Sequence, residues 1–137
     1  MKISEIDKVT QGLQGLLETV VDIPIYVNRN RPTKGLPEQF VDVQINGTIR
    51  SLTNTRELSV GRIAAAIHTK LLSTDAVNEK KEDIILKKIE ELFNNGTITN
   101  GIFKYTIASD MIFNGKSILT GYSSKVLNIE VTIYKNN

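Results

Sequence analysis

The sequence contains no cysteine and a single histidine, His68, among its 137 residues. Without cysteine the chain cannot form a disulfide, a thiolate nucleophile or a cysteine-ligated zinc site. A zinc site built from several histidines is excluded as well, because only one imidazole is present. We therefore expect neither a resident metal nor a cofactor.

Long apolar runs and an excess of one charge are also missing. No run approaches the roughly 20 apolar residues that a membrane-spanning helix needs, and Met1–Asp7 lacks the apolar centre of a signal peptide. The 17 basic and 15 acidic residues leave a net charge of +2, which gives no strong attraction to nucleic acid or acidic membranes. We expect no membrane partner and a protein that is made and assembled in a cytoplasm.

Two amphipathic helices are predicted from the spacing of apolar side chains. Residues 3–20 and Asn78–Phe93 repeat such side chains at steps of three and four, which is typical of a helix with one buried face. Asp75 or Asn78 can cap the second helix. Gly12 and Gly15 weaken the first helix, and we expect them to mark a place where another backbone comes close.

Strands are predicted where apolar and polar residues alternate. Ile23–Val27 and Phe40–Ile45 flank a loop, Asn28–Gln39, that contains two prolines and a glycine. The segment 62–72 is ambiguous, because Ala64–Ala66 favours a helix by propensity. Its alternation favours a strand, which we choose. The polar segment 48–59 can extend its neighbours into a long hairpin.

The last third of the chain predicts two long antiparallel strands, Phe103–Phe113 and Leu127–Tyr134. Each has one apolar and one wetter side. We expect the apolar side to pack under the helices and the wetter side to face a lumen or a partner ring.

The order of elements, helix, strands, helix and strands, predicts one α+β domain over residues 1–137. We expect a mostly antiparallel β-sheet with two α-helices packed on one face.

No residue pattern indicates catalysis. His68 has no recognised partner nearby in the sequence, so we expect it to be structural or exposed. We expect the carboxylates to be surface or capping groups, because none stands at a spacing typical of catalytic or metal-binding pairs; they are Asp42, Glu57, Asp75 and Asp110. We therefore expect no enzymatic activity.

Eight polar residues are candidates for contact with a partner. Some lie in the loop and the middle segment, where the alternative is an ordinary solvated surface, and the others lie on the wetter side of the C-terminal strands. They are Arg29, Arg31, Lys34, Arg50, Arg56, Lys104, Glu130 and Tyr134.

This arrangement resembles the tail terminator, or tail completion, proteins of long-tailed bacteriophages, over nearly the whole chain. The resemblance rests on the N-terminal helix, the strand Phe40–Ile45, a strand leading into a charged helix, and the closing pair Phe103–Phe113 and Val126–Tyr134. It implies a virion protein of the tail or neck, assembled in the host bacterial cytoplasm. Such proteins form a hexameric homo-oligomer ring that caps the tail tube protein and meets the head connector, while DNA passes through the lumen without sequence-specific binding.

Two other interpretations remain open. The chain can be another neck component, such as a head-closure or connector ring protein. Alternatively, it can be a small cytoplasmic domain that binds nucleic acid or a protein, with the loop arginines as its contacts. An enzyme is the weakest interpretation, since the sequence has neither a phosphate-binding loop nor a nucleophile elbow.

Overall fold

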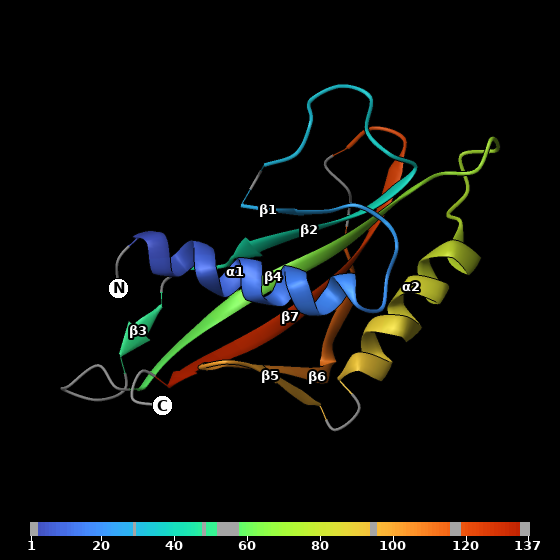
Figure 1. Cartoon of the computed structure of the whole chain (residues 1–137). Coiled ribbons are helices and arrows are strands. Elements are labelled where there is room, and N and C mark those ends of the chain that lie inside the picture. The colour runs from blue at the N-terminus through green and yellow to red at the C-terminus, as the bar shows by residue number, and fades with distance from the viewer. Residues whose placement is uncertain are drawn as a thin grey trace.

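The computed structural model describes residues 3–28, 30–47, 49–51, 58–93, 96–115 and 119–134, with the backbone alone for residues 3–6 and 108–115. Within these ranges the chain forms two α-helices and a seven-stranded, mostly antiparallel sheet, so the predicted α+β fold is confirmed (Figure 1). The elements are α1 (Ile3–Glu18), β1 (Ile25–Val27), β2 (Gln39–Ile45), β3 (Arg50–Ser51), β4 (Leu58–Lys70), α2 (Glu79–Leu92), β5 (Thr97–Asn100), β6 (Phe103–Gly115) and β7 (Tyr122–Tyr134).

The sheet is built around a long ladder between β4 and β7. These strands pair antiparallel over all 13 residues of each, from Leu58 opposite Tyr134 to Lys70 opposite Tyr122. The strand order is β1-β2-β4-β7-β6-β5, and β3 pairs with β4 beyond the end of β2. Among the described strands, β1 and β2 are the one pair that is parallel. Pairing between β3 and β4 fits the predicted extension of a hairpin, although residues 52–57 lie outside the described ranges.

The strand predicted at residues 62–72 is confirmed over residues 62–70 as part of β4, which ends at Lys70, two residues earlier than predicted. Ile63, Ala65 and Ile67 are fully buried, while Ala64 and Ala66 lie on the opposite face and are half-buried. Backbone partners on both sides, in β2 and β7, satisfy the peptide groups of this segment. This pairing outweighs the weak helix propensity of three alanines, which amounts to less than about 1 kcal/mol per residue.

Both helices pack on the same face of the sheet (Figure 1). Leu13 and Leu17 of α1 and Ile89 of α2 are fully buried in one core cluster with the apolar side of the strands. The expected orientation of the C-terminal strands is confirmed, because this cluster also contains Tyr105, Leu127, Ile129, Val131 and Ile133.

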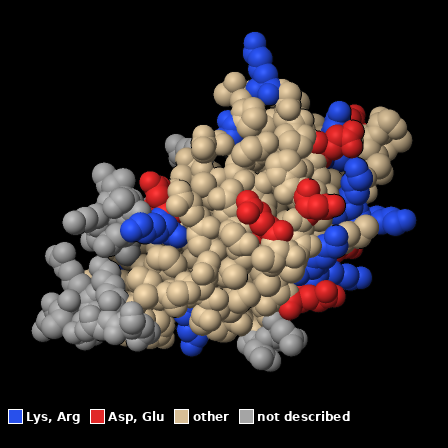
Figure 2. All heavy atoms as spheres, in the orientation of Figure 1, with Lys and Arg blue, Asp and Glu red and all other residues tan. Residues whose placement is uncertain are grey.

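Polar contacts fix α2 over the strand ends. The side-chain oxygen of Asn78 accepts a hydrogen bond from the Lys81 amide, so Asn78 is the cap. Ser123 Oγ of β7 donates to Glu82 Oε2 at 2.9 Å, and Lys125 Nζ lies 3.4 Å from Asp83 Oδ1. Figure 2 shows blue and red side chains intermingled along this edge, so the helix-bearing face has no extended area of one charge there.

Gly12 marks a close approach, as predicted, but to a side chain rather than a backbone. A Cβ at Gly12 would lie 2.5 Å from Tyr105 Oη of β6, whereas a Cβ at Gly15 would meet nothing within 4 Å. The Tyr105 hydroxyl donates to the Val9 carbonyl at 2.6 Å, and burial raises the pKa of this phenol well above its ordinary value. The α1 helix therefore approaches β6 closely because residue 12 has no side chain.

Two features of the sheet differ from the sequence prediction. The prediction missed β5, whose Thr97–Asn100 segment contains a single apolar residue and no alternating pattern. In β6 the register shifts between Ile107 and Ile112, so Ile112 rather than Phe113 stands opposite Leu127. The uninterrupted alternation expected from Phe103 to Phe113 is therefore wrong, because a bulge changes the phase of the strand.

Candidate functional site

The sheet face opposite the helices is the candidate functional surface, and we call it the helix-free face. Alternation along β4 and β7 assigns one set of side chains to the core and the other to this face. Residues of β4 and β7 on the helix-free face stand opposite one another. Arg62 is opposite Glu130, and Ala66 is opposite Val126. Most of these residues are half-buried or exposed.

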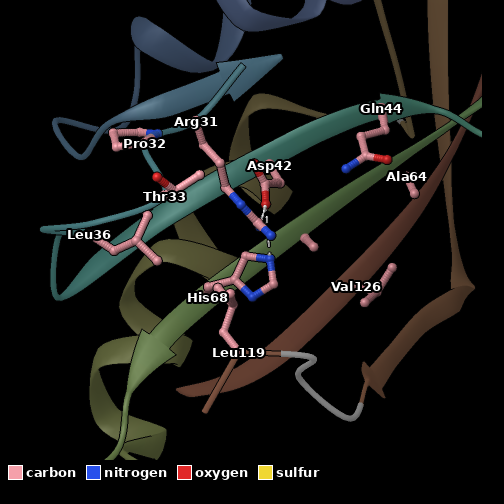
Figure 3. Close-up of a pocket in the computed structure, with 11 residues that line it drawn as sticks. Arg31, Pro32, Thr33, Leu36, Asp42, Gln44, Ala64, His68, Leu119 and Val126 are labelled. Atoms are coloured by element: carbon pink, nitrogen blue, oxygen red, sulfur yellow. Dashed lines mark hydrogen bonds and ion pairs between the residues drawn. The ribbon is translucent and has the colours of Figure 1, made fainter. Parts of the chain in front are cut away.

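A pocket of about 630 Å³ opens on the helix-free face (Figure 3). Its floor is formed by β2, β4 and β7. Ala64 and Ala66 have small side chains, which leave space above the backbone of β4. Its walls come from residues 31–36 and from Leu119, which precedes β7. The pocket is therefore lined mainly by aliphatic side chains, with Arg31 in the loop wall and Asp42 and His68 on the strands of the floor.

Four polar residues form a connected group at this pocket, and three of them, Arg31, Asp42 and His68, line it. Arg31 Nη1 donates to Asp42 Oδ2, and His68 Nε2 lies 3.3 Å from the same oxygen. Ser124 Oγ and His68 Nδ1 are 2.8 Å apart. The Asp42 and His68 side chains are only 5% and 7% exposed, whereas that of Arg31 is 23% exposed. A buried carboxylate needs such partners, since an unpaired one costs several kcal/mol.

Aromatic side chains enclose the histidine and attach the loop. Phe40 stacks on His68 with a centroid distance of 4.9 Å, and Tyr26 and Tyr122 pack edge-on against Phe40. The Tyr122 hydroxyl donates to the Pro37 carbonyl at 2.8 Å. Residues 30–38 are thus held to the sheet through Arg31 and Pro37, and the Lys70 amide of β4 also donates to the Glu38 carbonyl at 2.7 Å.

The sequence analysis was wrong about Asp42, which is a buried ion-pair partner rather than a surface or capping group. His68 is buried and hydrogen-bonded, and is therefore structural rather than exposed. Asp42, His68 and Ser124 stand on three neighbouring strands, β2, β4 and β7. Only the register of these strands brings the three side chains together. One signal was present in the sequence: Asp42 is the single charged residue of its strand and stands between Val41 and Val43.

Serine, histidine and aspartate in hydrogen-bond contact also occur in hydrolases. Here the Asp42 oxygen that His68 faces also accepts a hydrogen bond from Arg31. Ser124 is only 5% exposed and does not line the large pocket, but it borders a second hollow of about 360 Å³ beside α2. Through Arg31 and Asp42, this group links the loop to the sheet.

The other end of the helix-free face is polar. Arg50, Arg62 and Glu130 border a smaller hollow of about 300 Å³. The β6 residue Lys104 stands opposite Thr132, on the same face. Tyr134, 36% exposed, ends this side of β7.

The structure therefore separates the predicted contact residues into two groups. Arg50, Lys104, Glu130 and Tyr134 share the polar end of the helix-free face, while Arg31 and the exposed Lys34 belong to the loop at the pocket. Arg29 and Arg56 lie outside the described residues.

Two further features bear on ligands and membranes. Among the described residues, no three histidine or acidic side chains are grouped so that they could hold a metal ion. In the same part of the chain, neither helix has the length and apolar character needed to cross a membrane.

Comparisons with known proteins identify the fold but no family. No protein-family model matches the chain, and no curated protein matches it. Among the solved structures 23 chains match. One of them, known only by a sequence label, superposes with a TM-score of 0.56 at 10% identity, covering 90% of this chain and 94% of its own. At this identity the likeness shows the fold alone.

Proposed function

We propose that the chain is a structural ring subunit of a bacteriophage neck, a tail terminator that caps the tail tube and joins it to the head connector. The observation that supports this most is the helix-free face, where two 13-residue strands present polar side chains and a pocket to the outside. A sheet with helices on only one side offers the other side for contact with a further layer.

The edges of the sheet fit a closed assembly rather than an open fibre. The edge strands β1 and β5 have only three and four residues. Short edge strands limit strand addition between copies, although β6 continues past its pairing with β5 at residues 103–106. Ring formation then depends on contacts made by the sheet face and the loops. Such contacts can join neighbouring subunits head-to-tail, with a rotation between subunits that closes the ring.

The order of elements supports the assignment to the tail terminator family. The described helices and strands have the order on which the resemblance rests, including the two long closing strands. In this proposal the chain acts without catalysis in the virion neck, after assembly in the bacterial cytoplasm, and DNA passes through the lumen.

Assembly with a tail tube protein tests the proposal. Sedimentation of the chain, alone and with tube protein from the same virion, is expected to reveal a closed oligomer that binds the tube. Binding to connector protein but not to tube would favour another neck component. A chain that stays monomeric alone and with either protein would contradict the proposal.

Binding of nucleic acid is a second candidate function, favoured by Arg50, Arg62 and Lys104 on one face. Glu130 stands opposite Arg62 and reduces the local positive charge. The terminator proposal predicts only weak, sequence-independent binding that falls with salt. Tight binding that is lost in the double variant Arg50→Ala, Lys104→Ala would favour the second function instead.

A further inference from the structure

A structured turn between β4 and α2 exposes two aliphatic side chains. Leu72 and Val77 are each 45% exposed, and they are two of the four large exposed hydrophobic residues in the described ranges. Figure 1 shows this turn projecting from the body of the molecule before α2 begins. Exposed aliphatic side chains that share one projection indicate a contact site more strongly than scattered ones do.

Hydrogen bonds give the turn a defined shape. The Leu72 amide donates to the Ala76 carbonyl at 2.9 Å, and the Asp75 amide donates to the Leu72 carbonyl at 2.8 Å. The Leu71 amide donates to the Gly121 carbonyl at 2.8 Å, which ties the turn to the start of β7. A preformed turn of this kind loses little conformational entropy when it docks.

The pocket on the helix-free face has matching chemistry. Leu36, Leu119 and Val126 line it together with the two alanines of β4. Its volume of about 630 Å³ equals that of roughly 20 water molecules in the liquid, which is room for two aliphatic side chains. The turn and the pocket are different surfaces, so two copies can pair them either head-to-tail, as in a ring, or reciprocally about a two-fold axis; the proposed ring takes the head-to-tail arrangement.

Charge also matches between the two surfaces. Asp75 is exposed in the turn, and Lys34 is exposed in the loop that forms the pocket wall. Arg31 lies in the same wall, but its guanidinium is already paired with Asp42, so Lys34 provides the charge for this contact. Opposite charges on the two surfaces favour their encounter and fix their orientation.

We propose that Leu72 and Val77 of one copy insert into this pocket of the next copy, with Asp75 facing Lys34. The inference rests on the proposed ring, and it names the contact that closes it. Repeated around an axis, this one contact links every subunit to two neighbours.

Cross-linking tests the contact directly, because the wild-type chain has no cysteine. Val77→Cys and Ala66→Cys, purified separately and mixed, are expected to form a heterodimer with a short bismaleimide at least tenfold faster than either alone. Ile84→Cys with Ala66→Cys is the matched control, since Ile84 is 47% exposed but lies on α2. Equal rates in both mixtures, or faster linking of Val77→Cys to itself, would overturn the inference.

A charge variant provides a second readout in folded protein. Lys34→Glu is expected to weaken self-association about two- to fivefold, as for an exposed ion pair. The effect should be smaller in an Asp75→Asn background, where asparagine tolerates the positive φ of 63°. The same loss in both backgrounds would overturn the pairing of Asp75 with Lys34.

Failure of the contact and failure of the ring are distinguishable. If Leu72→Asp with Val77→Asp leaves the mass of the oligomer unchanged, the contact is wrong and the ring stands. If the Val77 and Ala66 cysteines link but the chain never binds tail tube, the contact is right and the terminator function is wrong.

Discussion

Arg31 is the residue that most directly connects the pocket wall to the core. Its guanidinium pairs with Asp42, a carboxylate that the sheet buries, and the same carboxylate contacts His68. The pair therefore contributes to the position of the loop as well as to stability. Since one partner is partly exposed, we place its contribution below that of a fully buried ion pair.

Removal of this guanidinium is expected to destabilise the fold. Arg31→Met keeps much of the aliphatic stem but leaves Asp42 with one partner fewer, so the free energy of unfolding should fall by about 1–3 kcal/mol. Urea denaturation measures it. Lys34→Met, in the same loop but fully solvated, should change it by less than about 0.5 kcal/mol. Equal losses in the two variants would contradict the assigned role of the ion pair.

Ser124 is expected to be chemically inert. Its hydroxyl is buried, and its histidine partner contacts a carboxylate that Arg31 already neutralises. A fluorophosphonate probe followed by mass spectrometry should therefore find no adduct on the folded chain. An adduct that disappears in Ser124→Ala would identify an active nucleophile and contradict a purely structural role.

Tyr105 predicts how stability depends on alkaline pH. Burial raises the pKa of its phenol above the ordinary value of 10.0, so the folded state stays neutral while the unfolded chain ionises. The contribution of Tyr105 to the free energy of unfolding is therefore complete below a pH of about 10. At higher pH it falls by up to about 1.4 kcal/mol per pH unit. The free energy of unfolding at pH 8, measured by urea denaturation, should be about 1 kcal/mol higher for wild type than for Tyr105→Phe.

That advantage should shrink and then reverse as the pH rises above 10. Tyr134→Phe, at an exposed position, is the control and should follow wild type throughout. A constant difference between wild type and Tyr105→Phe across this range would show that the phenol titrates normally in the folded state.

At the scale of elements, α1 provides a matched pair of glycines. Gly15→Ala should stabilise the protein by about 0.5–1 kcal/mol, because alanine favours helix and the new methyl group meets nothing. Gly12→Ala should instead destabilise it by about 1–3 kcal/mol, since its methyl group would overlap the fixed Tyr105 hydroxyl. Thermal unfolding measures both. Stabilisation by both substitutions would show that α1 does not lie against β6 as described.

The sequence predicted those helices and strands whose pattern of apolar residues lies within the element itself. The alternation of Ile63, Ala65 and Ile67 was enough to identify β4 despite its alanine run, and the apolar spacing identified both helices. The short strand β5 was missed because its residues lack any pattern, and its pairing with β6 depends on tertiary contact. The bulge in β6 had no sequence signal that we could use.

The site was harder to predict than the fold. Asp42, His68 and Ser124 contact one another because β2, β4 and β7 pair in a particular register. A shift of one residue in that register would move each side chain to the other face. Such a cluster cannot be inferred from spacing along one chain. The polar face of β7 was predictable, because alternation alone determines it.

At the scale of the whole molecule, the two faces of the sheet have different surroundings. One face is filled by α1 and α2, and the other presents the pocket at one end and a polar area at the other. We infer that the second face makes the contacts between subunits and toward the lumen. The proposed function follows from this division rather than from any chemical group.

Electron microscopy of tail tubes assembled with and without the chain tests this central claim most directly. The account predicts a ring of chain subunits on one end of each tube and tubes that stop growing once the ring is present. Tubes with bare ends and unchanged growth at saturating chain concentration would contradict it.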